Sequence, residues 1–545
     1  MRGLMMDAPL MISSIIEHAA RNYSEQQIVS RTVEGPIHRY TYTQAHARCK
    51  QLARALQALG VQAGDRVATL AWNGYRHFEL YYAVSGIGAV CHMINPRLFE
   101  DQVTYIVNHA QDRFIFLDLT FVALVEQLAP RFEGVAGFVI MTDREHMPDT
   151  ALPNAYCYEE LLEAQPPDFE WPRFDEWTAS SLCYTSGTTG NPKGVLYSHR
   201  STVLHALSVL ACDDVHIDQY SACLPVVPMF HVNAWGVPYA VPIAGGRLVF
   251  PGPRMDGKSL AELINEEGVT DAWGVPTVWL GVLGHMGETG QRFTRLKSVL
   301  IGGSAAPQAM IKSFREEYGV KALQGWGMTE MSPVGTVSTL KPYMQDWPDA
   351  ERYNVLGKQG RALYGVDMKI VGTEGEALPH DGKAYGELLV RGAVVTSAYF
   401  NDEQASRKAF DADGWFRTGD VATIDPDGYM QIVDRTKDVI KSGGEWISSI
   451  DLENAAVSHP KVVEAAVVAV PHPKWGERPL LVVVKTADAD LTKDELVEYL
   501  RPRVAKLWLP DDVVFVDQLP HTATGKLRKS ALREQYRDYV LPTRG

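Results

Sequence analysis

The stretch Tyr184-Thr-Ser-Gly-Thr-Thr-Gly-Asn-Pro-Lys-Gly-Val195 follows directly after the short apolar run 181–183. Its glycines let the backbone turn sharply and bring N–H groups against a ligand without a Cβ in the way. Its hydroxyl groups can donate to phosphate oxygens, and Lys193 adds a positive charge. The stretch therefore predicts a polyphosphate-binding loop, with an ordinary surface turn as the alternative. The loop residues are Thr185, Ser186, Gly187, Thr188, Thr189, Gly190 and Lys193.

This loop differs from the Walker pattern, because Pro192 stands where the second glycine of that pattern falls. It resembles the signature of the acyl-adenylate-forming (AMP-binding) ligases, which include acyl-CoA synthetases, carrier-loading domains and luciferases. The chain is identified as a member of that superfamily because five further blocks follow in the family's order. They are Pro228-Met-Phe-His231, Gly325-Trp-Gly-Met-Thr-Glu330, Gly414-Trp-Phe-Arg-Thr-Gly-Asp420, Asp434-Arg-Thr-Lys-Asp-Val-Ile-Lys-Ser-Gly-Gly444 and Thr524-Gly-Lys526.

The domain organisation follows from length and pattern. At 545 residues the chain is too long for one compact core. Short β-rich runs alternate with helical patterns up to about residue 430, which predicts an α/β fold of mostly parallel sheets covered by helices. The resemblance implies an N-terminal nucleotide- and acyl-binding domain over 1–434 and a hinge over 435–438. A small, mobile α+β domain over 439–545 carries the catalytic lysine.

Local patterns give more specific expectations. Thr43 is expected to cap a helix that stops at Gly60. The apolar runs 66–71, 114–117, 137–140, 247–250 and 298–301 are expected to be buried strands. Near the C-terminus, Tyr429 to Val433 reads as a strand and Thr492 as a helix cap, with an irregular, charged segment at 434–444.

The composition of the chain indicates which kinds of partner and compartment are expected. The net charge of −14 disfavours non-specific nucleic-acid binding, which needs a basic surface. The six cysteines show no metal-ligand spacing, which favours reduced thiols in a cytoplasmic enzyme. The N-terminus lacks the pattern of a signal peptide, and no apolar run approaches the ~18 residues of a membrane span. Peripheral membrane contact stays open.

The resemblance implies that ATP activates a carboxylic acid and that Mg²⁺ assists. Glu330 and Thr185 are then the metal ligands, since a hard cation prefers oxygen and keeps several waters. Thr329 hydrogen-bonds the α-phosphate. Glu330 could instead be an acid that complements a helix start.

The remaining nucleotide contacts are assigned by the same resemblance. Gly302, Gly303 and Ser304 follow an expected strand, and their small size lets nucleotide and acyl chain lie against backbone. Trp326 replaces the usual tyrosine beside adenine, and Asp420 with Arg435 holds the ribose hydroxyls. Further expected ATP or AMP contacts are His231, Gln324, Gly325, Lys437, Lys441 and Trp446.

The expected catalytic cation is Lys526, in Thr524-Gly-Lys-Leu-Arg-Lys529. A compact ammonium can bridge the carboxylate and the α-phosphate as charge shifts in the transition state. Without the resemblance, this stretch would be a solvated basic tail. Gly443, Gly444 and Glu445 are expected at the coenzyme A side.

The acyl pocket is expected at Trp235, Gly302 and Pro333. Amino-acid-activating relatives carry an acid near His231, but residues 226–240 contain no Asp or Glu. An ammonium buried there would be unpaired and costly, so amino-acid substrates are disfavoured. No carrier domain follows either, which makes free coenzyme A the expected acceptor.

The sequences of the segments His92-Met-Ile-Asn-Pro-Arg97 and 441–447 resemble those of medium-chain fatty-acyl-CoA synthetases and 3-methylmercaptopropionyl-CoA ligases. A medium-chain fatty acid is the first choice of substrate and the thioether acid is the alternative. A luciferase-type monooxygenase and a non-catalytic nucleotide-binding scaffold are alternatives of other classes. Fatty-acyl relatives imply a homodimer.

Overall fold

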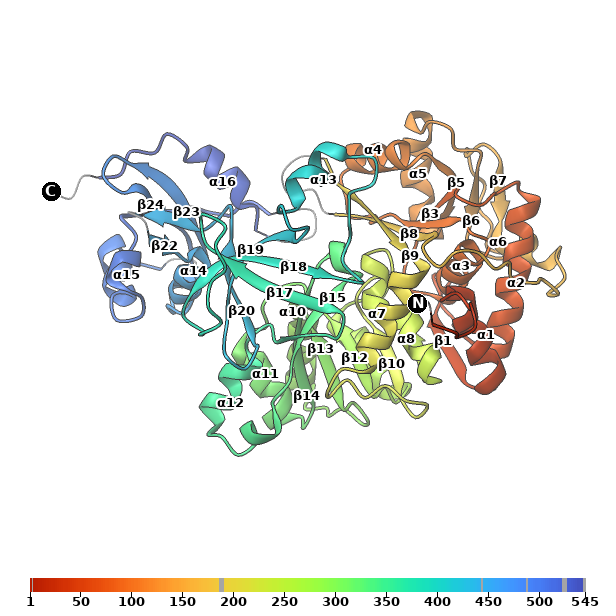
Figure 1. Cartoon of the computed structure of the whole chain (residues 1–545), viewed down its shortest axis with the longest axis horizontal. Coiled ribbons are helices and arrows are strands. Elements are labelled where there is room, and N and C mark those ends of the chain that lie inside the picture. The colour runs from red at the N-terminus through yellow and green to blue at the C-terminus, as the bar shows by residue number, and fades with distance from the viewer. Residues whose placement is uncertain (2, 186–190, 443–444, 487–488, 522–526, 543–545) are drawn as a thin grey trace. The chain divides into compact units, whose positions relative to one another are not determined.

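The computed structural model describes the whole chain except residues 2, 186–190, 443–444, 487–488, 522–526 and 543–545. The chain forms two compact units (Figure 1). Unit 1 contains Met1–Ser186, Asn191–Asp367 and Arg391–Phe410, and unit 2 contains Met368–Val390 and Asp411–Gly545. Unit 2 is therefore larger than the expected domain over 439–545, and the hinge at 435–438 stays a prediction.

The first sheet of unit 1 has the strand order β7-β6-β5-β3-β4-β8-β9. Its pairs are parallel except β8 with β9. The interior strands are short apolar runs that are buried on both faces, as parallel sheets require. Their bounds are β3 Arg66–Leu70, β4 Val90–Met93, β5 Asp112–Leu117, β6 Gly137–Ile140, β7 Ala155–Cys157, β8 Ala179–Tyr184 and β9 Gly194–Ser198.

The second sheet of unit 1 has the order β16-β15-β14-β13-β12-β10-β11-β1-β2. The run from β14 to β1 is parallel, and antiparallel strands close both edges. The strands are β1 Gln27–Arg31, β2 Ile37–Thr41, β10 Ala222–Pro225, β11 Arg247–Phe250, β12 Asp271–Gly274, β13 Ser298–Ile301, β14 Lys321–Gly327, β15 Val334–Ser338 and β16 Arg361–Ala362.

Helices cover both sheets of unit 1. All residues of α3 (Tyr75–Gly86) are buried, because this helix contacts β4 and β8 of the first sheet and β1 of the second. Helices α1 and α2 pack against α3 and against each other (Figure 1). The helices of this unit are α1 Ile12–Asn22, α2 Tyr42–Ala58, α4 Glu100–Ala110, α5 Val122–Leu128, α6 Tyr158–Glu163, α7 His199–Leu210, α8 Val237–Ala244, α9 Gly257–Glu266, α10 Pro276–Thr289, α11 Gln308–Lys312, α12 Asp349–Leu356 and α13 Glu403–Ala409.

Unit 2 has a sheet of order β17-β18-β19-β20, in which β18, β19 and β20 are antiparallel, and a second sheet β22-β21-β24-β23, with β25 paired to β24. The strands are β17 Val366–Val371, β18 Tyr385–Gly392, β19 Phe416–Ile424, β20 Met430–Arg435, β21 Ile440–Ser442, β22 Glu445–Ile447, β23 Val462–His472, β24 Gly476–Lys485 and β25 Asp512–Phe515. Its helices are α14 Ser449–Val457, α15 Lys493–Leu500 and α16 Lys529–Gln535. The α/β prediction of mostly parallel sheets with a separate α+β part is confirmed.

Several local predictions also hold, and two are wrong. The five expected buried strands and the cap at Thr492 are present. Helix α2 starts earlier than expected, because the side chain of Thr41, and not that of Thr43, accepts from the backbone of Gln44 in a reciprocal capping box. The segment 434–444 is not irregular throughout, since it contains the end of β20 and all of β21. Among the described residues, no helix combines the length and apolar character needed to cross a bilayer.

Candidate active site

The predicted phosphate loop lies between the antiparallel strands β8 and β9. The backbone N–H of Thr185 donates to the carbonyl of Lys193 at 2.9 Å, and the Lys193 N–H donates to the Thr185 hydroxyl at 3.1 Å. These bonds close the base of the loop and fix Lys193 beside Thr185. The expected phosphate contacts Ser186, Gly187, Thr188, Thr189 and Gly190 lie outside the described residues.

Glu330 and Lys193 both contact Tyr399, one at its hydroxyl and the other at its ring. The Tyr399 hydroxyl donates to Glu330 Oε1 at 2.7 Å, and the Lys193 ammonium lies 4.7 Å from the centre of the Tyr399 ring. The backbone of Glu330 is held as well, since its carbonyl accepts from Thr396 N–H at 2.8 Å. Burial and the Glu330 carboxylate raise the pKa of Tyr399, so its hydroxyl stays a donor. The structure thus joins the predicted metal ligand to the predicted loop lysine.

Thr329 is buried, and its carbonyl accepts from the Tyr197 hydroxyl at 2.5 Å. The carboxylate of Glu330 offers the hard oxygen that Mg²⁺ prefers, and Mg²⁺ commonly uses only one or two carboxylates together with waters. The described residues hold no group of three or more His, Cys, Asp or Glu side chains arranged for a metal. The Glu330 carboxylate therefore fits the single carboxylate ligand of a hydrated Mg²⁺.

The block after His231 forms a strained turn. Val232, Asn233, Ala234 and Trp235 have φ of 45°, 53°, 48° and 55°, and Gly236 follows at 81°. A left-handed conformation costs roughly 1–2 kcal/mol for each non-glycine residue. Contacts with the surrounding residues offset this free-energy cost, because the Asn233 amide donates to the Ser181 hydroxyl at 3.2 Å and the turn is buried. Such strain is typical of functional sites.

The turn directs Trp235 onto the glycines that follow β13. A Cβ added to Gly302 would lie 2.9 Å from Cη2 of the indole and 3.0 Å from the Gly325 carbonyl oxygen. At Gly303 the corresponding distance to Trp235 is 4.0 Å, and φ is +80°. The close approach at position 302 requires glycine, whereas at position 303 it is the positive φ that favours glycine. The structure therefore brings Trp235, Gly302 and Gly303 together, whereas Ser304 next to them is exposed.

Of the other predicted unit 1 residues, Gln324, Gly325 and Trp326 lie on β14, Pro333 directly precedes β15 and His231 follows β10. The Gln324 carboxamide accepts from Ala306 N–H at 3.0 Å and donates to the Gly357 carbonyl at 3.1 Å, which supports the loop after β13. Trp326 is buried, with its ring 3.2 Å from where a Cβ on Gly335 would be. Pro333 accepts from Met328 N–H at 3.1 Å, and half-buried His231 donates its N–H to Pro228 at 3.1 Å.

Unit 2 holds the predicted ribose contacts. Asp420 on β19 lies opposite Arg435 on β20, and Asp420 Oδ1 is 2.8 Å from Arg435 Nε. The carboxylate is 2% exposed and the guanidinium 53% exposed, so the pair presents its cationic side to solvent. Placement on neighbouring antiparallel strands makes this pairing a direct consequence of strand register.

Other predicted unit 2 residues follow Arg435. Asp438 and Val439 N–H groups both donate to the Arg435 carbonyl, at 2.9 and 2.8 Å, so Lys437 lies in a tight turn. Lys441 is exposed on β21, and Trp446 accepts from the Tyr385 hydroxyl at 2.6 Å. Gly443, Gly444 and Lys526 lie outside the described residues. For Glu445, only the backbone is described, as part of β22.

Two residues without an expected role organise these sites. Tyr399 links Lys193 to Glu330, and it stands in no family block quoted above, so no pattern identified it. Fully buried Asp434 accepts from Ser449 N–H at 2.5 Å, which joins the end of β20 to the start of α14. Asp434 begins one of the family blocks quoted above, but no role was expected for it there, and a polar run of this kind is also typical of a solvated linker.

Comparison with known proteins settles the family. The AMP-binding enzyme family matches residues 16–400, and the AMP-binding enzyme C-terminal domain matches residues 451–526. The chain belongs to the AMP-binding enzyme family.

Individual relatives span nearly the full chain. A 3-methylmercaptopropionyl-CoA ligase of Ruegeria lacuscaerulensis is 51% identical over 99% of both chains. A medium-chain-fatty-acid–CoA ligase of Ectopseudomonas oleovorans is 48% identical over 99% of this chain and 98% of that one. Among solved structures, ATP-bound MatB from Rhodopseudomonas palustris superposes with a TM-score of 0.80 and 25% identity over 96% of this chain and 99% of that one.

Proposed function

We propose that this enzyme is an AMP-forming acyl-CoA ligase. It activates a carboxylic acid with ATP and then transfers the acyl group to coenzyme A. A medium-chain fatty acid is the proposed substrate. Both relatives named above are CoA ligases, which supports the reaction class.

One observation carries the choice of acid: the indole of Trp235 covers Gly302 within a buried, apolar segment. The described neighbours Val226, Val227, Phe230 and Val237 are all buried. Such a wall favours a hydrocarbon tail, since each buried CH₂ gains roughly 0.8 kcal/mol. No acid at 226–240 would pair with an amino-acid ammonium.

The first half-reaction forms a bond between a carboxylate oxygen and the α-phosphorus of ATP, and pyrophosphate leaves. In our proposal Lys193 and the loop hydroxyls bind the β- and γ-phosphates, Thr329 binds the α-phosphate and Lys526 offsets the charge that shifts between carboxylate and phosphate. Asp420 and Arg435 bind the ribose, Trp326 lies beside adenine, and His231 lines the carboxylate region. Glu330 and Thr185 would hold Mg²⁺, which supplies positive charge to the phosphates.

In the second half-reaction the coenzyme A thiol attacks the acyl carbon, and the carbon–oxygen bond to AMP breaks. The thiol proton is lost, and AMP leaves as the anion. We place Gly443, Gly444 and Glu445 beside the entering coenzyme A, and Lys441 and Trp446 near the nucleotide.

A 3-methylmercaptopropionate ligase is the second candidate. The relative that is 51% identical carries that name, which favours this short thioether acid. Both acids fit an apolar wall, so only a substrate series separates them.

The test is coenzyme-A-dependent AMP formation across straight, branched, aromatic and thioether acids. A maximum among medium-length straight-chain acids supports the first candidate. A maximum on 3-methylmercaptopropionate supports the second, and AMP formation that does not need coenzyme A or produces light would reject the ligase assignment.

Assembly and compartment are also proposals. We infer a homodimer from the resemblance to fatty-acyl enzymes, to be checked by light scattering. All six cysteines are free thiols, which accords with a reducing cytoplasm.

A further inference from the structure

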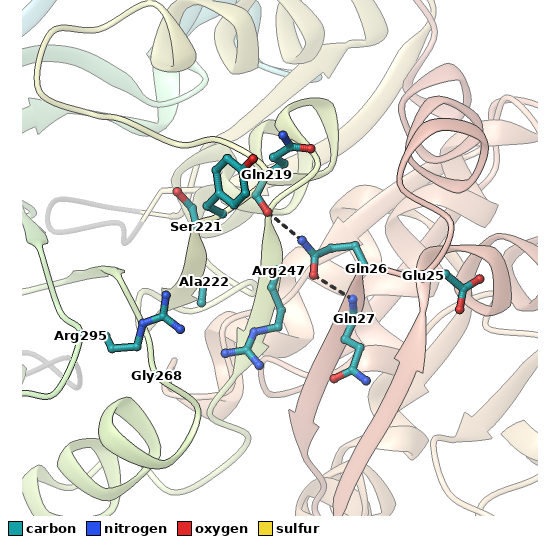
Figure 2. Close-up of a pocket in the computed structure, with 10 residues that line it drawn as sticks. Glu25, Gln26, Gln27, Gln219, Ser221, Ala222, Arg247, Gly268 and Arg295 are labelled. Carbon is teal, nitrogen blue, oxygen red and sulfur yellow. Dashed lines mark hydrogen bonds between the residues drawn. The ribbon is translucent and has the colours of Figure 1, made fainter.

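A polar pocket lies in unit 1, and none of its lining residues belongs to the motifs named above (Figure 2). It has a volume of about 340 Å³, near the lower end of the range for small-molecule sites. Its lining residues are Glu25, Gln26, Gln27, Gln219, Tyr220, Ser221, Ala222, Arg247, Gly268 and Arg295. Apart from Ala222 and Gly268, all of these residues have polar side chains.

The pocket is at the amino-terminal edge of the second sheet. Ala222 begins β10, Arg247 begins β11 and Arg295 precedes β13. The candidate active-site residues instead follow the carboxyl ends of these parallel strands: His231 comes after β10 and Gly302 directly after β13. Strands of four residues separate the two edges by roughly 13 Å. A ligand in this pocket would therefore not occupy the nucleotide or acyl site.

Two guanidinium groups enter the pocket from different segments, Arg247 from β11 and Arg295 from the loop before β13 (Figure 2). Glu267, an acid close to Arg247, is already engaged by Arg39 through two contacts of 2.8 and 2.5 Å. Its carboxylate is 3.8 Å from Arg247, which donates instead to the Glu267 backbone carbonyl. Glu267 thus neutralises mainly Arg39.

Arg295 forms no hydrogen bond or ion pair within the described part of the chain. Its stem crosses Gly268, where an added Cβ would be 3.1 Å from Arg295 Cδ. Burial lowers the pKa of Arg247, Glu267 opposes this, and the positive charges of Arg39 and Arg295 lower it further. Glu25 is exposed and points away from both guanidinium groups (Figure 2). Glu267 thus offsets the charge of Arg247 only in part, and Arg295 adds a positive charge that no acid within the described residues pairs.

Three glutamines also line the pocket. The Gln26 carboxamide is fixed, because it donates to the Gln219 and Gly245 carbonyls at 2.9 and 3.0 Å and accepts from Gln27 N–H. The carboxamides of Gln27 and Gln219 make no side-chain hydrogen bond with any described residue. They can donate and accept at once, as hydroxyl groups of a ligand require.

We propose that this pocket binds a small phosphorylated metabolite that carries several hydroxyl groups. Arg247 and Arg295 bind the phosphate, for which planar guanidinium groups are well suited. Gln27 and Gln219 bind the hydroxyl groups. The site is separate from the proposed ligase activity and does not depend on it.

The test is calorimetric titration of the full chain with glucose 6-phosphate, with excess AMP present to fill the nucleotide site. Inorganic phosphate and glucose are titrated in parallel. We expect one saturable site, with glucose 6-phosphate several-fold tighter than phosphate and no binding of glucose. Arg295→Gln should weaken both phosphate-bearing probes at least tenfold. Gln27→Leu should weaken glucose 6-phosphate alone.

Arg173→Gln is the matched control, because Arg173 is another exposed arginine of unit 1 outside the pocket. It should bind like the wild type. Unchanged AMP binding in every variant would show that each protein is folded. The proposal is overturned if the wild type shows no saturable binding beyond AMP, if phosphate binds as tightly as glucose 6-phosphate, or if Arg295→Gln binds like Arg173→Gln.

Discussion

The indole of Trp235 lies directly on Gly302, so that an added Cβ there would be 2.9 Å from Cη2. A real Cβ essentially never comes this close, and the Gly325 carbonyl 3.0 Å away closes the other side. The wall of the proposed acyl pocket therefore has no room for a larger residue at 302 unless the indole moves.

Trp235→Ala should move the preferred acyl length or raise KM across C2 to C16 acids. In the wild type, each methylene that fits adds roughly 0.8 kcal/mol, a several-fold gain in kcat/KM up to the end of the pocket. Gly302→Ala should shift preference toward shorter acids. Profiles of kcat/KM with melting curves are the measurement. Trp171→Phe is the control, because Trp171 and Trp235 are both 8% exposed. If Trp235→Ala lowered the melting temperature without changing the acyl-length profile, the indole would be a core residue with no role in acid preference.

Tyr399→Phe should raise KM for MgATP by roughly tenfold, since a hydrogen bond to a charged group contributes about 1.5–3 kcal/mol. The ring remains for Lys193, so the variant isolates the hydroxyl on Glu330. Tyr399→Leu removes the contacts to both Glu330 and Lys193, so it should raise KM for MgATP further. Pyrophosphate release at varied Mg²⁺ is the readout. If phenylalanine left the Mg²⁺ dependence unchanged, Tyr399 would not orient Glu330.

Lys526→Ala should lower adenylate formation by a factor of hundreds, about the loss seen when a preorganised charge is removed. Thioester formation from supplied acyl-AMP should persist. The two half-reactions are measured separately by pyrophosphate release and by acyl-CoA formation. Equal losses in both would contradict the assigned role, and Lys529→Ala is the neighbouring control for adenylation.

Lys437→Pro tests the predicted hinge. Proline fixes φ and removes a backbone donor, in a turn where Asp438 and Val439 N–H groups bond the Arg435 carbonyl. It should slow whichever half-reaction needs a backbone conformation that the ring excludes, and spare the other. Lys437→Ala should affect neither in this selective way. Two unchanged rates for the proline variant would dismiss a hinge at this residue.

Glu453 should make unit 2 less stable as pH rises. Burial raises the pKa of its carboxyl from 4.5 to about 7, although Lys529 Nζ is 2.7 Å away. The folded state therefore binds this proton more tightly than the unfolded state. Its contribution is full below pH 4.5 and is lost as pH rises through 7. Melting temperatures of wild type and Glu453→Gln, compared from pH 4 to 8, should show wild type falling relative to the variant. The opposite slope would show that Lys529 keeps the carboxylate ionised.

Sequence patterns predicted the sheets well, because strands such as β5 and β13 are apolar on both faces and read as short hydrophobic runs. The expected cap at Thr43 was wrong, although Gln44, three residues after Thr41, completes a capping-box pattern that favours Thr41 over Thr43. The family motifs named Trp235, Glu330 and Asp420. They did not give Tyr399 or the pocket at Arg247, because contacts between distant segments leave no local periodicity.

The left-handed turn from Val232 to Gly236 bears on protein engineering. Its four non-glycine residues adopt a backbone that their own chemistry disfavours, so the shape is imposed by the sheet and helices around it. A chimera that receives only this pentapeptide would relax to an ordinary conformation and lose the direction of the indole. Transfer of acid preference to another scaffold therefore requires moving the turn together with the β8 residue Ser181 that anchors Asn233.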